Sequence, residues 1–276
     1  MNNDVLLVLE QFKLVLFLVM VCAITSMIAF FSRFFNLEKP KIVVELSFWQ
    51  VLLGFVIYFL TGTVLGFVFL PFFKFFNPQT FGDTLYLLSN ICIVLLFLLF
   101  FYKLGPQKTH QILGDGAKST SFIFGVISWF VAFPLSALIG LIIQIFVHMI
   151  TDYNLHEQLA VLHLKNLMDF PLLFILTSLS FAIIIPFLEE LIFRGFLLNY
   201  LKKFVNRHLA ILFSAAIFAL FHFSTKQSYD NIELIVSLFV LGWFLGFLYE
   251  KKRSIFAPFG LHVAFNAISI IRIISS

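Results

Sequence analysis

The sequence predicts an all-α polytopic membrane protein, a bundle of about eight transmembrane helices. Of its 276 residues, 61% are hydrophobic and only 12% are charged, and the mean hydropathy is +1.05. Soluble domains carry about 25% charged residues, so this composition excludes a soluble fold. Apolar runs of about 18 or more residues, enough to cross a bilayer, recur along the chain. We therefore expect membrane lipids around the protein and no nucleic acid partner.

The spans and their loops follow a regular order. The connecting loops hold three, one, three, one, four, one and three Lys or Arg residues in turn. By the positive-inside rule, the rich loops are cytoplasmic and both termini lie outside. The expected spans are Leu14–Phe31, Leu46–Leu70, Leu85–Tyr102, Thr120–Ile150, Phe170–Leu188 or beyond, Leu209–Phe223, Ile232–Tyr249 and Ile255–Ile274.

The most polar loop, Thr151–Asp169, separates two unlike halves. Residues 1–169 form a front half with four spans that are poor in intramembrane polar groups. Residues 170–276 form a back half with four spans that hold nearly all such groups. We expect these halves to be subdivisions of one bundle rather than separate domains.

Two adjacent carboxylates and a guanidinium, Glu189, Glu190 and Arg194, lie within the fifth apolar run. Placing a charged side chain at bilayer depth costs at least ~2.5 to 3.5 kcal/mol of free energy. Such groups are therefore paired with each other, solvated in a cavity or required for function. On a helix, Glu190 and Arg194 share a face and can form an ion pair. Glu189 lies about 100° around the helix and has no local partner. We therefore expect Glu189 to be functional.

Three more polar side chains, His222, His262 and Asn266, lie within later spans. His262 and Asn266 are four residues apart and share a helix face. Counted from the nearest basic residues, Glu189 and His222 lie about 20 Å deep and His262 about 13 Å deep. This similar depth predicts one polar chamber, which we expect to open toward the basic, cytoplasmic loops.

The length of the fifth span leaves two arrangements open. As one helix, residues 170–202 would be about 50 Å long, too long for a hydrocarbon core of about 30 Å. Pro186 is the natural place for a kink. Alternatively, Glu189 lies at the inner interface and residues 191–204 run along the membrane surface, far from His222. The chemistry favours the kinked span.

These side chains together predict a hydrolase that acts through an activated water molecule. A carboxylate screened from bulk water is suited to take a proton from water. Imidazoles can orient that water, donate to an oxyanion or bind a metal, and the Asn266 amide is a neutral donor. The serine motif Gly-x-Ser-x-Gly and the zinc motif His-Glu-x-x-His are both absent from the chain.

A second class of function is a non-enzymatic membrane protein, such as a transporter or a scaffold. Such a protein would use the buried polar cluster for ions or protons. A transporter would more naturally show inverted repeats, and the chain has no second matching half.

Three motifs carry a resemblance to a known family. Glu189-Glu190-x-x-x-Arg194, Phe218-x-x-x-His222 and His262-x-x-x-Asn266 follow one another over about 80 residues. In this order they resemble the motifs of the type II CAAX prenyl protease family, also called CPBP or Abi. This family includes bacteriocin-immunity proteins, so the non-enzymatic alternative that the resemblance implies is a bacteriocin-immunity scaffold. The resemblance covers roughly residues 170–274.

The resemblance implies an intramembrane endopeptidase and a role for each residue. Glu189 would be the general base, and His222 would help to position the water. His262 and Asn266 would form the oxyanion hole, while the supporting residues Glu190 and Arg194 would hold the base.

The resemblance also bears on cofactor, substrate and location. The family is often labelled as metalloproteases, and Glu189, His222 and His262 could hold zinc with an open position for water. No residue forces that choice. The implied substrate is a membrane-anchored hydrophobic or lipid-modified peptide, either prenylated and of CAAX type or bacteriocin-like. The expected location is the prokaryotic cell (inner) membrane.

Overall fold

A computed structural model describes residues 3–38, 44–75, 80–114, 117–151, 153 and 156–275, with side chains from residue 10 onward. The structure is 84% helical, and the described residues contain no β-strand. The predicted all-α fold is therefore confirmed. Lys39 and Lys41, which contribute to the predicted charge alternation, lie outside the described residues.

The helices follow the predicted spans closely. The described chain has seven helices that are long and apolar enough to cross a membrane, so this is a multi-pass membrane protein. The span expected at Leu209–Phe223 is a shorter helix of 14 residues. In order, the helices are α1 (Asn3–Phe31), α2 (Phe48–Phe69), η1 (Leu70–Phe75), α3 (Phe81–Leu104), α4 (Pro106–Leu113), α5 (Lys118–Thr151), α6 (Leu159–Asn166), α7 (Pro171–Leu179), η2 (Ser180–Ile184), α8 (Ile185–Glu190), η3 (Leu191–Leu198), α9 (Asn199–Leu201), α10 (Arg207–Leu220), α11 (Asp230–Lys252) and α12 (Phe256–Ser275).

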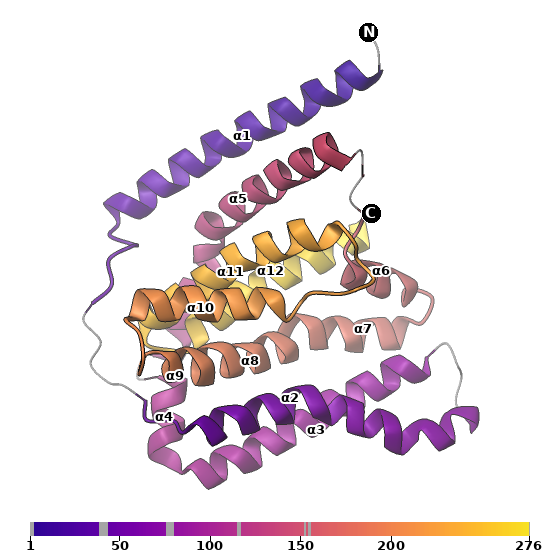
Figure 1. The fold of residues 1–276 in the computed structure, drawn as a ribbon, viewed down its shortest axis with the longest axis vertical. Helices are drawn as coiled ribbons and strands as arrows, with labels where there is room; N and C mark the ends of the chain where they lie inside the picture. The colour runs from indigo at the N-terminus through magenta and orange to yellow at the C-terminus, as the bar shows by residue number, and fades with distance from the viewer. Residues whose placement is uncertain are drawn as a thin grey trace.

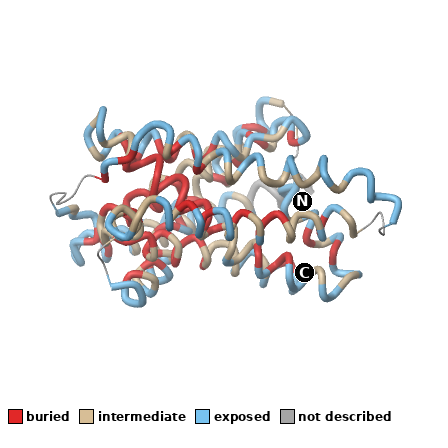
Figure 2. The backbone as a smooth tube through the Cα atoms, turned by 90° about the horizontal axis from the view of Figure 1, so that it is seen from below, coloured by how far each residue is buried: buried red, intermediate tan, exposed pale blue. Residues whose placement is uncertain are grey.

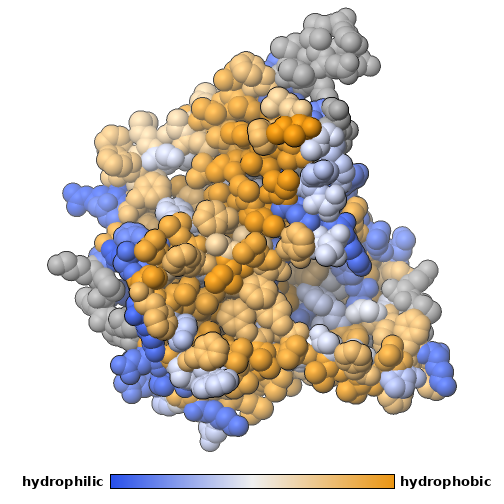
Figure 3. Space-filling view, viewed as in Figure 1, coloured by the Kyte–Doolittle hydropathy of each residue, from blue (hydrophilic) through white to orange (hydrophobic). Residues whose placement is uncertain are grey.

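The long helices run between two ends of the molecule (Figure 1). One end, here called the basic end, holds α4, α9 and the helix termini next to the Lys- and Arg-rich loops. The opposite end holds α6 and the C-terminus. In Figure 3 a broad hydrophobic surface lies between hydrophilic residues gathered along the left and right margins. This surface fits a membrane crossed by the helices from one end to the other.

The two halves of the chain share one core. Buried residues gather in the centre of the molecule and toward the basic end (Figure 2). The core contains side chains from both halves, among them Ile93, Phe97, Phe193, Phe218 and Leu261. Helix α5 of the front half packs along α11 and α12 of the back half. The division of this bundle into a front half and a back half at residue 169 stays a prediction.

The fifth span is one helical run from Pro171 to Leu201 that contains two π-helical segments. The segments η2 and η3 are π-helical and flank the short α-helix that contains Pro186. Every residue of Leu191–Leu198 is buried. The alternative that laid residues 191–204 along the membrane surface, far from His222, is therefore wrong, because residues 191–198 form part of the core and His222 lies 3.9 Å from Glu189.

Candidate active site

The π-helical turn before Pro186 makes one backbone carbonyl available to the site. In the π-helical turn, the Ile185 amide donates to the carbonyl of Ser180 rather than to that of Phe181. Pro186 has no N–H to offer to a preceding carbonyl. The Phe181 oxygen instead accepts a hydrogen bond from Nδ2 of Asn266, at 2.8 Å. This bond ties α12 to the fifth span beside the predicted catalytic residues.

A fully buried ion pair lies on the other side of the site. Nη1 of Arg194 donates to Oε1 of Glu190 at 3.0 Å, and both side chains are 0% exposed. The guanidinium also donates from Nη2 to the Gly242 carbonyl at 3.0 Å and lies over the Phe218 ring, 4.6 Å from its centroid. The predicted i,i+4 pair is present, and its further contacts join the fifth span to α10 and α11.

The Glu190 carboxylate also orients His262. Nδ1 of His262 lies 2.8 Å from the same Oε1 atom that accepts from Arg194. Because that oxygen acts as an acceptor, the hydrogen of this bond is on Nδ1. Nε2 of His262 therefore faces the other carboxylate, 3.6 Å from Oε2 of Glu189.

His222 approaches Glu189 from α10 with a similar orientation. Its Nδ1 lies 2.9 Å from the Phe218 carbonyl, which can only accept, so Nδ1 carries the hydrogen. Nε2 then has a free lone pair and lies 3.9 Å from Oε1 of Glu189. Separations of 3.6 and 3.9 Å are too long for direct hydrogen bonds and suit a bridging water.

The predicted residues therefore meet at one cavity of about 310 Å³. Glu189, His222, His262 and Asn266 all line it, and the supporting residues Glu190 and Arg194 lie buried directly behind. Most of the remaining wall is apolar and is formed by residues of α6, α11 and α12, namely Ala160, Val161, Leu164, Leu234, Leu238, Leu241, Ile270 and Ile273.

The direction of this cavity differs from our expectation. Its wall extends along α12 to Ile273 and along α11 to Leu234, and α6 borders it, all toward the end opposite the basic end. Toward the basic end, the residues that follow Glu189 in the fifth span, Glu190 to Leu198, are all buried in the core. The count of depth from the basic residues could not show this direction, because it does not depend on how α6, α11 and α12 pack.

Helix α6 borders the cavity at the opposite end. It is bound to α3 by Nε2 of His163, which lies 2.7 Å from Oδ1 of the buried Asp83. The preceding segment is bound to α11, because the His156 amide donates to Oδ1 of Asp230 at 2.9 Å. The polar loop of the sequence thus becomes part of the wall of the site.

Comparison with known proteins agrees with this geometry. Residues 171–268 match the family model described as "Rce1-like: Type II CAAX prenyl endopeptidase Rce1-like". We call this matched segment the Rce1-like domain. The match begins at the first residue of α7 and includes all six predicted site residues. No curated protein and no solved structure matches the chain.

The match confirms the resemblance found in the three motifs. The matched family is that of type II CAAX prenyl endopeptidases, which are hydrolases, and the match covers residues 171–268 of this chain. The catalytic role of each residue is not decided by the match.

The zinc expectation receives no direct support from the geometry of the Rce1-like domain. The part of the chain that the structure describes has no group of three or more His, Cys, Asp or Glu side chains placed to hold a metal ion. Zinc at Glu189, His222 and His262 stays a prediction.

One residue that contacts the predicted base comes from outside the Rce1-like domain. The hydroxyl of Tyr58 on α2 donates to Oε1 of Glu189 at 3.1 Å. Sequence reasoning missed it, because a single tyrosine in an apolar span, 131 residues away, carries no spacing signal. Only the packing of α2 against the domain brings the two together.

Proposed function

We propose that this protein is an intramembrane endopeptidase in which Glu189 activates a water molecule to cleave a lipid-modified, membrane-anchored peptide. One observation supports this most strongly. The Glu189 carboxylate faces the Nε2 atoms of two histidines from different helices at 3.6 and 3.9 Å, inside a largely apolar cavity. This arrangement leaves room for a water beside a proton acceptor.

The first step is the attack of water on the peptide carbonyl. Nε2 of His222 accepts a hydrogen bond from the water and orients it, and Glu189 takes one of its protons. The water oxygen forms a bond to the carbonyl carbon, and the carbonyl electron pair moves onto its oxygen. When the tetrahedral intermediate collapses, the C–N bond breaks and Glu189 returns the proton to the leaving amine. The products are a carboxylic acid, which keeps the second proton of the water until it ionises, and an amine.

His262 and Asn266 supply the donors for the negative oxygen. Asn266 uses one amide hydrogen on the Phe181 carbonyl and keeps the second for the oxyanion. His262 gives Nδ1–H to Glu190, so its protonated form offers Nε2–H to the cavity. Glu190 and Arg194 act through His262 and are positioning residues.

Replacing Asn266 with alanine should lower kcat by about 10²- to 10³-fold, the range measured for loss of one oxyanion donor. KM should change little, because the donor acts mainly on the transition state. Steady-state kinetics on a fluorogenic peptide checks this. Ser275→Ala, near the end of the same helix and remote from the cavity, is the matched control. Equal kcat for both variants would contradict the role of Asn266.

The apolar wall favours a lipid-modified or strongly hydrophobic substrate. A prenyl chain or apolar side chains would bury their surface against the leucines and isoleucines of α11 and α12. To test this, purified protein in liposomes receives two peptides of one sequence, with and without an S-farnesyl cysteine before three apolar C-terminal residues. Preferential cleavage of the farnesylated peptide supports the proposal. Equal cleavage favours a bacteriocin-like hydrophobic peptide, and no cleavage of either contradicts the function.

We further propose that the cavity faces the outer side of the membrane. The positive-inside rule puts the basic end in the cytoplasm, and the cavity extends toward the opposite end. In a variant lacking Cys22 and Cys92, Ser269→Cys should react with a membrane-impermeant maleimide added to intact cells. Gln107→Cys, exposed on α4 at the basic end, should react only after lysis. The reverse pattern would place the cavity on the cytoplasmic side.

A further inference from the structure

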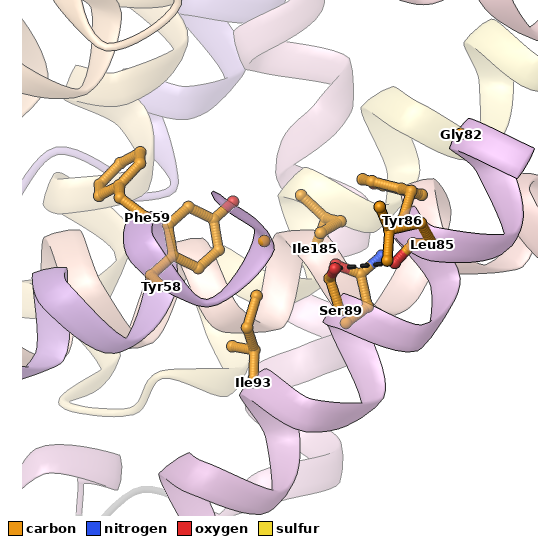
Figure 4. Close-up of a pocket in the computed structure, with 10 residues that line it drawn as sticks. Tyr58, Phe59, Gly82, Leu85, Tyr86, Ser89, Ile93 and Ile185 are labelled. Atoms are coloured by element: carbon orange, nitrogen blue, oxygen red, sulfur yellow. Dashed lines mark hydrogen bonds between the residues drawn. The ribbon is translucent and has the colours of Figure 1, made fainter. Parts of the chain in front are cut away.

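A second cavity, of about 350 Å³, lies beside the site between α2 and α3. Tyr58 and Phe59 form one wall, and Leu85, Tyr86 and Ser89 form the wall across from them (Figure 4). Ile185 lines both this cavity and the one around Glu189. The front half of the chain therefore approaches the proposed base from the side of α2 and α3.

The contact between Tyr58 and Glu189 involves the catalytic carboxylate itself. Oε1 accepts from the Tyr58 hydroxyl at 3.1 Å, and the same oxygen faces Nε2 of His222 at 3.9 Å. Oε2 faces Nε2 of His262 at 3.6 Å. Among the described residues, Tyr58 supplies the hydrogen bond that fixes which carboxylate oxygen faces which histidine.

Aromatic packing holds Tyr58 in this position. Its ring meets Phe59 edge-on at 4.8 Å, and Phe59 stacks on Phe221 of the α10 C-terminus at 4.6 Å. Phe221 directly precedes His222. The stack therefore fixes α2 against the segment that carries the second histidine.

We propose that Tyr58 is a positioning residue of the active site. Its hydrogen bond sets the rotation of the Glu189 carboxylate, so that one oxygen is directed to the water held by His222. The proposal rests on the proposed endopeptidase function, and it assigns part of the site to the front half. A hydrogen bond to a charged group contributes enough to change a rate by about ten- to a hundredfold.

The test compares Tyr58→Phe with wild type on the farnesylated fluorogenic peptide in liposomes. We expect kcat to fall about ten- to a hundredfold with KM nearly unchanged, because the ring stays and only the hydroxyl is removed. Tyr86→Phe is the matched control. It lines the same cavity, but its hydroxyl bonds Asn90 and Ser180 rather than Glu189. The thermal unfolding of both variants is measured in parallel.

The outcomes separate the two proposals. A kcat loss confined to Tyr58→Phe, with unfolding like that of Tyr86→Phe, supports the positioning role. Wild-type kcat in Tyr58→Phe, an equal loss in both variants, or a change in KM alone would overturn it while leaving the endopeptidase function intact. Failure of the wild-type protein to cleave the peptide overturns both.

Discussion

Replacing Glu189 with glutamine should lower kcat by about 10²- to 10⁴-fold, the usual contribution of a general base. Glutamine keeps the size of the side chain and can still face both histidines, but it cannot take a proton from water. Because Glu189 is nearly buried at 8% exposure, no bulk solvent base replaces it easily. Rates of peptide cleavage by purified wild type and variant measure the effect.

A matched control distinguishes loss of the base from loss of a membrane carboxylate. Glu233 also lies in a transmembrane helix, where it accepts a hydrogen bond from Ser237 at 2.9 Å. Glu233→Gln should keep near-wild-type kcat. Retained cleavage in Glu189→Gln would refute the assignment of the base. If biological activity depends on Glu189 but no peptide is cleaved, the transporter or immunity-scaffold alternative gains support.

Replacing Arg194 with methionine should destabilise the protein by about 3–5 kcal/mol, the cost of removing one partner of a buried ion pair. The substitution leaves the Glu190 charge with no exposed surface and removes the donor to the Gly242 carbonyl. Unfolding of the purified protein in detergent measures the change. Arg272→Met, near the C-terminal end of α12, is the surface control.

A double variant separates the effect of this ion pair on stability from its effect on catalysis. The double variant Glu190→Leu with Arg194→Met removes both charges and should recover most of the lost stability. Its kcat should stay low, because His262 has lost the acceptor for Nδ1. A double variant with full activity would show that Glu190 does not position His262. A stable single variant would show that the pair contributes little to the fold.

Much of this site could be predicted from the sequence because its signals are local. Charged residues in apolar spans are energetically costly, so Glu189, Glu190 and Arg194 can be identified as candidate site residues from the sequence alone. Spacing by four residues places Glu190 with Arg194 and His262 with Asn266 on shared helix faces. Both pairs lie at the candidate site, where Arg194 donates to Glu190 and Asn266 donates to the Phe181 carbonyl.

Other features depend on packing between distant segments, which spacing does not encode. Tyr58 reaches Glu189 only because α2 packs beside the fifth span. The wall of the cavity includes α6, an eight-residue helix within a loop of the predicted topology. Residues 191–198 are apolar enough for either a core or a membrane surface, and only their burial decides between the two.

The most direct measurement of the central claim follows a single turnover in H₂¹⁸O. Excess protein cuts the farnesylated peptide, acid stops the reaction within one turnover, and intact mass spectrometry examines protein and products. The account predicts one ¹⁸O atom in the new carboxylate and an unmodified protein mass, because water attacks the carbonyl directly. A protein mass increased by that of an acyl fragment, or a peptide left uncut, would contradict it.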